Sequence, residues 1–313
     1  MGLLSSVSAS DYPSKPVNIL LGFEPGGTLY TQAEVLAEVL SETLQQNVFL
    51  QVKPGFGGGV ATAMLSDSTN EGYILLFTPS FPLTDYPARL QVSYSLDDFT
   101  YISSLSADQH AFVTSAKAPF NTWDGFLNYA RAQGEVLYAS QNLTDRLIMQ
   151  RIADIEGFSI RVIPVSGGAG MAPIVITGDV DIAFSGGTHS RFTDSGEMIV
   201  LATTGDKPSV FYPNIPTLAE LGYDFGMQSI RLLLAPRNLP QEQLEILTNA
   251  LEIVSQDHRF IQVTQDTIRQ PLISLQGDEL KQFLQQQQAK LIQLMNTHQD
   301  PAESDAIIRI QPR

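Results

Sequence analysis

The chain has 313 residues, a formal charge of −15 at pH 7 and no cysteine, and 43% of its residues are hydrophobic while 16% are charged. This balance is typical of a folded chain, and the absence of cysteine excludes disulfides, thiolate metal sites and cysteine nucleophiles. The acidic excess argues against nucleic acid as a partner, because that kind of binding draws its affinity from clustered Lys and Arg.

The length favours two domains, and the sequence contains no run of about 18 apolar residues that could span a membrane. Short apolar runs alternate with amphipathic segments. This alternation predicts an α/β fold with mostly parallel sheets that are covered on both faces. We expect strands at 17–23, 48–52, 73–77, 99–105, 111–115, 136–140, 160–165 and 180–184, and helices at 29–44, 122–133, 143–156, 241–256 and 278–297.

Two glycine-pair junctions, at 23–28 and 164–170, each connect a strand-like run to a helix-like run. Glycine lets the backbone approach a ligand closely, and the first turn of a helix offers free N–H groups and a partial positive charge. Ligands of parallel sheets lie beyond the carboxyl ends of the strands, where both junctions fall. The pair therefore predicts an anion site in a cleft between two domains.

The chain is expected to cross between the domains twice, near 111–119 and 231–236, where a strand-like run ends in a proline-containing loop. The first domain then comprises residues 1–113 and 237–313, and the second domain, 114–236, is inserted into it. A hinge is expected at the two crossings, with an open form and a form that closes on the ligand.

Several short motifs occur in a characteristic order along the chain. They are Tyr12 to Val17, Phe23 to Gly27, Lys53 to Gly58, Glu71 to Leu76, Gly178 to Phe184, Asn214 to Gly222 and Leu233 to Pro236. With them the chain resembles the substrate-binding receptors of tripartite tricarboxylate transporters, often called Bug receptors. The resemblance covers residues 12 to about 297.

The resemblance implies a two-domain fold of the periplasmic-binding-protein type (type II, or Venus flytrap) with the ligand cleft between the domains. It implies a receptor, not an enzyme, that captures a small carboxylate outside the cytoplasm and delivers it to the permease subunits of the transporter. No cofactor or metal is expected, and the receptor is expected to be a monomer. Residues 1–10 fit the end of a removed or truncated signal peptide, or a cloning remnant, so we expect a periplasmic protein.

Members of the family hold the carboxylate largely with backbone N–H groups of two loops, which correspond here to 25–30 and 166–170. Further lining is expected from segments that follow other strands. Carried onto this chain, the predicted ligand-binding residues are Phe23, Gly26, Gly27, Thr28, Tyr30, Thr78, Ser80, Phe81, Ser140, Asn142, Thr144, Ser166, Gly167, Gly168, Gly170, Ser185, Gly186 and Arg231.

Two departures from the family pattern bear on the ligand. Tyr30 stands where many members have an Asp that suits amino-bearing ligands, and 141–146 replaces a glycine-rich segment with a His. Arg231 could pair with a second carboxylate through its planar fork, or form an interdomain ion pair. The sequence thus favours a di- or tricarboxylate over an amino acid, with an aromatic ligand body as an option near Tyr30 or Phe81.

An enzyme is the competing hypothesis. Ser190, His189 and Asp194 could be drawn as a hydrolase triad, although a polar turn explains them more simply. The first glycine junction copies the spacing of a P-loop, but Thr28 stands where the phosphate-binding Lys belongs. The histidines are scattered without metal-ligand spacing.

Overall fold

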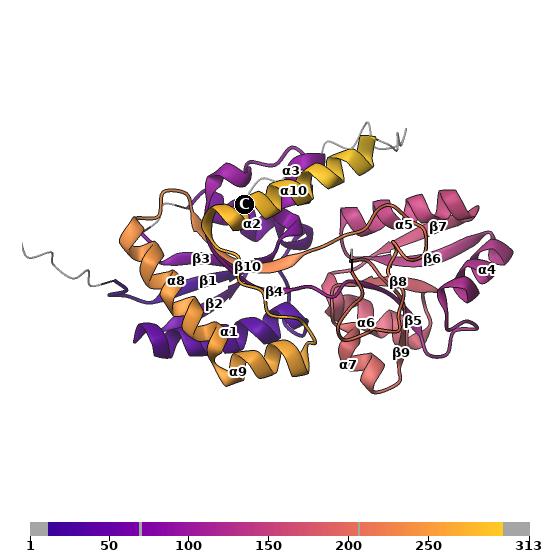
Figure 1. The fold of residues 1–313 in the computed structure, drawn as a ribbon, viewed down its shortest axis with the longest axis horizontal. Helices are drawn as coiled ribbons and strands as arrows, with labels where there is room; N and C mark the ends of the chain where they lie inside the picture. The colour runs from indigo at the N-terminus through magenta and orange to yellow at the C-terminus, as the bar shows by residue number, and fades with distance from the viewer. Residues whose placement is uncertain (1–11, 69–70, 206, 297–313) are drawn as a thin grey trace, which may run out of the picture.

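A computed structural model describes residues 12–68, 71–205 and 207–296, which form two lobes side by side (Figure 1). Lobe 1 is built on a five-stranded sheet in the order β2-β1-β3-β10-β4, and lobe 2 on a five-stranded sheet in the order β7-β6-β8-β5-β9. The interpretation of residues 1–10 as the end of a signal peptide lies outside the described residues. No helix in the described ranges combines the length and apolarity needed to cross a bilayer.

The strands match the runs that the sequence predicts, with β9 as an addition. In lobe 1 they are β1 (Val17–Leu21), β2 (Val48–Val52), β3 (Ile74–Pro79), β4 (Phe99–Ala107) and β10 (Ile230–Pro236). In lobe 2 they are β5 (Ala111–Ser115), β6 (Glu135–Ser140), β7 (Ser159–Pro164), β8 (Ile182–Ser185) and β9 (Met198–Thr203).

One strand in each sheet runs against the other four. β10 pairs antiparallel with both β3 and β4, and β5 pairs antiparallel with both β8 and β9. The remaining pairings, of β1 with β2 and β3 and of β6 with β7 and β8, are parallel. Both sheets are therefore mixed, and each reversed strand is the first one after the chain enters its lobe.

Helices cover both faces of each sheet (Figure 1), which confirms the predicted α/β class. The C-terminal helices return to lobe 1, where they pack on α1, α3 and β4. The helices of lobe 1 are α1 (Thr28–Leu44), α2 (Gly59–Ser66), α3 (Phe81–Arg89), α8 (Gln241–Gln256), α9 (His258–Ile261) and α10 (Gly277–Asn296). Those of lobe 2 are α4 (Trp123–Gln133), α5 (Leu143–Glu156), α6 (Gly167–Thr177) and α7 (His189–Asp194).

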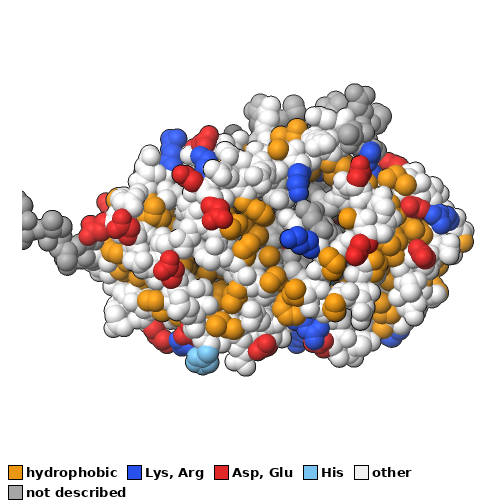
Figure 2. All heavy atoms as spheres, in the orientation of Figure 1, with side chains coloured by type: hydrophobic (Ala, Val, Ile, Leu, Met, Phe, Trp, Pro, Cys, Tyr) orange, Lys and Arg blue, Asp and Glu red, His pale blue; other side chains and the backbone are white. Residues whose placement is uncertain are grey.

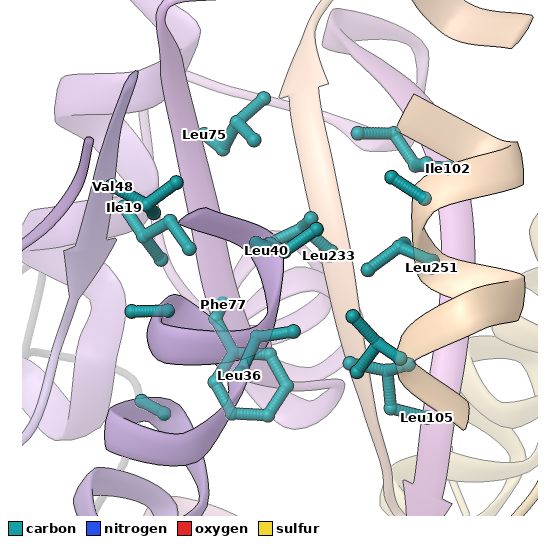
Figure 3. Packing of buried hydrophobic residues seen from close by; sticks show 14 of the residues in the cluster. Ile19, Leu36, Leu40, Val48, Leu75, Phe77, Ile102, Leu105, Leu233 and Leu251 are labelled. Carbon is teal, nitrogen blue, oxygen red and sulfur yellow. The ribbon is translucent and has the colours of Figure 1, made fainter. Parts of the chain in front are cut away.

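The core of lobe 1 follows from the two periodicities of the sequence. Ile19 and Phe77 point to the face of the sheet that Leu36 and Leu40 of α1 cover, and Leu251 of α8 belongs to the same cluster beside Leu105 and Leu233 (Figure 3). Alternate strand residues point to the opposite face and pack in the cluster that includes α2 and α10. Because both faces are apolar, the sheet is fixed between two helix layers, and its loop ends are held in place.

Lobe 2 repeats this arrangement with an aromatic core. Phe112, Tyr138 and Phe184 pack with Trp123 and Phe126 of α4 on one face of the sheet, while α6 covers the other. Acidic side chains are dispersed over the face of the molecule in Figure 2 and are interspersed with Lys and Arg. The net negative charge therefore does not form a single patch on that face.

Candidate ligand-binding site

A cavity lies where the two lobes meet, and both lobes contribute walls to it. It contains about 580 Å³ of empty space, including the part that is open to solvent. Most of its lining follows the carboxyl ends of strands, as expected for sheets of this kind. The lining residues are Phe23, Glu24, Gly27, Thr28, Leu29, Tyr30, Pro79, Phe81, Asp108, His110, Gln141, Ser166, Gly167, Gly168, Ala169, Phe184, Gly186, Thr188 and Arg231.

The N-terminus of α1 opens into this cavity from lobe 1. Gly26 has a φ of +95°, a conformation that favours glycine, and it turns the chain from β1 into the helix. Gly27 is the N-cap residue, and its lack of a side chain leaves the first turn of α1 without a side-chain cap. The N–H groups of that turn are therefore available to an anion.

The N-terminus of α6 lines the same cavity from lobe 2. Its N-cap, Ser166, makes no side-chain capping hydrogen bond, so this helix also presents an uncapped first turn. Gly168 has a further role, because a Cβ at this position would lie 1.8 Å from Oγ1 of Thr188. The close approach of Thr188 to the α6 backbone thus requires glycine here for packing within lobe 2.

A substitution at Gly168 is therefore expected to destabilise the protein as well as to affect the cavity. Gly168→Ala should lower the free energy of unfolding by about 1–3 kcal/mol through overpacking, measured by urea denaturation. Thr188→Gly in the same chain should restore part of the loss by removing the clashing side chain. Gly27→Ala is the matched control, because the nearest atom to its added Cβ is 4.0 Å away. Equal stability of the wild type and Gly168→Ala would contradict this packing role.

Arg231 lines the cavity at the start of β10, but its guanidinium is held by protein groups. Its Nε donates to Asp108 Oδ1 at 2.8 Å, Nη1 donates to Gln32 Oε1 at 3.0 Å, and Nη2 donates to Thr28 Oγ1 at 2.6 Å. The side chains of Asp108 and Arg231 are each only 3% exposed. Arg231 therefore forms a buried ion pair whose partner the sequence did not identify.

Asp108 is ionised in this setting because the Arg231 guanidinium pairs with it. Burial by itself raises the pKa of this carboxyl group, but Arg231 and the nearby His110 outweigh burial and lower the pKa to about 2. Nε2 of His110 lies 3.5 Å from Asp108 Oδ2, and the hydroxyl of Ser229 donates to the same oxygen at 2.8 Å. The Asp108 backbone N–H also donates to the Ser229 carbonyl. These bonds tie the segment after β4 to the segment before β10, so the two crossings between the lobes are joined.

The structure divides the predicted ligand-binding residues into two groups. Those that line the cavity are Phe23, Gly27, Thr28, Tyr30, Phe81, Ser166, Gly167, Gly168, Gly186 and Arg231. Those that are not part of its lining are Gly26, Thr78, Ser80, Ser140, Asn142, Thr144, Gly170 and Ser185.

Polar side chains of the second group serve the fold. The buried Ser80 accepts a hydrogen bond from the backbone of β10, and Ser140 donates to the carbonyl of Asn142. The Asn142 side chain accepts from two backbone N–H groups at the start of α5 and caps that helix. Thr144 donates to Asp85 of α3 and so joins the two lobes beside the cavity. The hydroxyl groups of Ser80, Ser140 and Thr144 and the amide oxygen of Asn142 are engaged in these contacts, whereas Nδ2 of Asn142 and Oγ1 of Thr78 have no hydrogen-bond partner among the described residues.

Several lining residues were missed by sequence reasoning. Asp108 and His110 follow β4, an antiparallel partner of β10, and carry no motif. Leu29 and Ala169 lie inside the two predicted loops at 25–30 and 166–170, and Pro79, Gln141 and Thr188 lie in the segments after other strands that were expected to add lining. The lining residues outside all of these segments are Glu24, Asp108, His110 and Phe184.

The family model described as "Tripartite tricarboxylate transporter family receptor" matches residues 32–299. The chain belongs to this receptor family. BugT of Bordetella pertussis is 28% identical to the receptor over 273 residues, which cover 83% of this chain and 82% of BugT.

Solved structures share the fold of the receptor. The periplasmic binding protein BugD has a TM-score of 0.82 at 21% identity, with 91% of this chain and 98% of BugD covered. MatC from Rhodopseudomonas palustris, solved with bound malate, has a TM-score of 0.81 at 17% identity, with 90% of this chain and 99% of MatC covered. The predicted two-lobed binding-protein fold is thereby confirmed.

The family assignment makes the chain a solute-binding receptor, and the hydrolase hypothesis is wrong. The local geometry explains why the three residues do not form a triad. Burial lowers the pKa of His189 to about 3, which makes it a weak base, and its Nδ1 lies 3.0 Å from the hydroxyl of Ser185. Ser190 donates instead to a backbone carbonyl of its own turn, and Asp194 pairs with Arg269.

Proposed function

We propose that this receptor captures a small carboxylate in the cavity between its lobes, in the periplasm, and delivers it to the permease subunits of a tripartite tricarboxylate transporter. The observation that carries the proposal is the meeting of two uncapped helix N-termini, those of α1 and α6, in one cavity. Each helix end favours an anion, and a carboxylate between them contacts both lobes. The bound malate in the similarly folded MatC is in keeping with a carboxylate ligand.

The proposed mechanism is closure of one lobe on the other. The boundaries expected from the sequence, at 113/114 and 236/237, cut through β5 and split β10 from its sheet, because Ala111–Ser115 belongs to the sheet of lobe 2 and Ile230–Pro236 to the sheet of lobe 1. We therefore place the division just before β5 and just before β10, and these two crossings serve as the hinge. A ligand that contacts both α1 and α6 favours the closed form over the open one. To shift the population from about 1:99 to 99:1, its preference for the closed form must be about 5.5 kcal/mol.

The test is a thermal-shift screen of carboxylic acids, followed by small-angle scattering with the best binder. We expect one acid to raise the melting temperature of the receptor and the same acid to reduce its radius of gyration, because ligand binding stabilises the closed form. The amide of that acid is the matched control and should do neither. If no acid in a broad panel raises the melting temperature, carboxylate capture is refuted; an unchanged radius at saturation would remove the closure mechanism alone.

A further inference from the structure

We infer that the ligand of this receptor carries a single carboxylate joined to an aromatic ring, and that the cavity rejects a second carboxylate. The inference rests on the proposed function, since it names the class of carboxylate that the same cavity takes. It follows from the charges on the cavity wall and from the side chains that surround them.

The cavity has no uncommitted cation for a second carboxylate. Among the described residues that line it, Arg231 is the only Lys or Arg, and Asp108 neutralises it at 2.8 Å. Thr28 and Gln32 take two further guanidinium donors. Glu24, at the exposed turn before α1, adds a negative charge to the wall.

The two helix ends supply enough positive charge for one carboxylate. An α-helix carries about +0.5 elementary charge at its N-terminus, so α1 and α6 together offer about +1. A first carboxylate between Gly27 and Gly168 balances that charge. A second carboxylate would find no uncommitted Lys or Arg among the described lining residues, because Arg231 is already neutralised by Asp108, and it would be repelled by the negative charge of Glu24.

The remaining walls suit a flat apolar body. Phe23 and Phe81 of lobe 1 meet edge to face, with ring centroids 6.1 Å apart, and both line the cavity together with Tyr30. From lobe 2, Phe184 adds an aromatic surface that is itself backed by Phe112. Aromatic rings stack well against one another in edge and offset arrangements. The wall chemistry therefore matches a ring that carries one acid group.

The experiment is isothermal titration of the full chain at pH 8. The probes are benzoate, terephthalate, malate and benzamide. We expect benzoate to bind at least about tenfold more tightly than terephthalate or malate, because of like-charge repulsion, and benzamide not to bind. A dicarboxylate that binds as tightly as benzoate overturns the inference and leaves carboxylate capture standing. If none of the three acids binds, the inference is also overturned.

Two variants separate the charge argument from the ring argument. Glu24→Gln removes a negative charge from the wall and should narrow the preference for benzoate over terephthalate. Phe23→Leu should weaken benzoate binding by roughly two- to tenfold, the range for one aromatic contact. Phe49→Leu is the matched control, since Phe49 of β2 is 51% exposed and does not line the cavity. An unchanged preference in Glu24→Gln, or equal benzoate affinity in the two Phe variants, would contradict the inference.

Discussion

Gly27→Val is expected to weaken carboxylate binding by roughly 150- to 20,000-fold, because two charge-assisted hydrogen bonds at about 1.5–3 kcal/mol each are lost when a side chain blocks the N-terminus of α1. The fold should be retained. Gly27 has φ −89° and ψ 163°, which any residue can adopt, and the nearest atom to an added Cβ is 4.0 Å away. The measurement is titration with the acid that gives the largest thermal shift.

Gly170→Val is the matched control for this variant. Gly170 lies in the first turns of α6, where an added Cβ would make only ordinary contacts at 3.7 Å or more, and it does not line the cavity. It should leave the affinity near that of the wild type. If Gly27→Val binds as well as the wild type, the backbone of α1 does not hold the carboxylate.

Replacing Asp108 by alanine is expected to lower the free energy of unfolding by about 3–5 kcal/mol, because it leaves the guanidinium of Arg231 buried without a counter-charge. The matched control is Asp97→Ala, which removes the exposed partner of Lys281 and should change stability by about 1 kcal/mol or less. In the double variant Asp108→Leu with Arg231→Met, both charges are absent. This double variant should be more stable than Asp108→Ala. A double-mutant cycle of Asp108→Leu and Arg231→Met that shows no coupling energy would refute the buried ion pair.

The same ion pair predicts a dependence of stability on pH. The folded pKa of Asp108, about 2, lies below the ordinary value of 3.8. The unfolded chain therefore binds the proton first on acidification, so the stabilisation is complete above about pH 4 and is lost as the pH falls towards 2. Urea denaturation at pH 6 and pH 3 should show a smaller loss of stability in Asp108→Asn than in the wild type. An equal loss would assign the acid sensitivity to other carboxyl groups.

Much of the architecture could be predicted because the local pattern and the tertiary structure agree. Helical spacing of apolar residues predicts α1 and α5 to within a residue, since the apolar stripe is also the face that packs on a sheet. Helix α3 was missed because Pro82 and Pro87 normally argue against a helix. Pro82 lies in the first turn, where proline is tolerated, and only the tertiary structure reveals this.

The backbone part of the site could be predicted, and its electrostatics could not. The glycine junctions can be recognised in the sequence because each directly joins a strand-like run to a helix-like run. The sequence alone therefore places Gly27 and Gly168 after the ends of strands. The partner of Arg231 depends on the pairing of β4 with β10, in which Arg231 lies opposite Ser106. Asp108 is distant from Arg231 in sequence, and no local rule selects it among the acidic residues of the chain.

The joined crossings share residues with the cavity wall, but they do not use all of its lining. Asp108, Ser229 and Arg231 fasten the connecting segments to each other, and Arg231 also donates to Thr28 in the first turn of α1. Glu24, Tyr30 and Gln141 line the cavity without taking part in these bonds. A hinge held by these bonds can keep its geometry while other residues of the cavity wall change. Proteins that evolve from this chain could therefore bind other ligands through substitutions at Glu24, Tyr30 or Gln141, without a change in the bonds that hold the hinge.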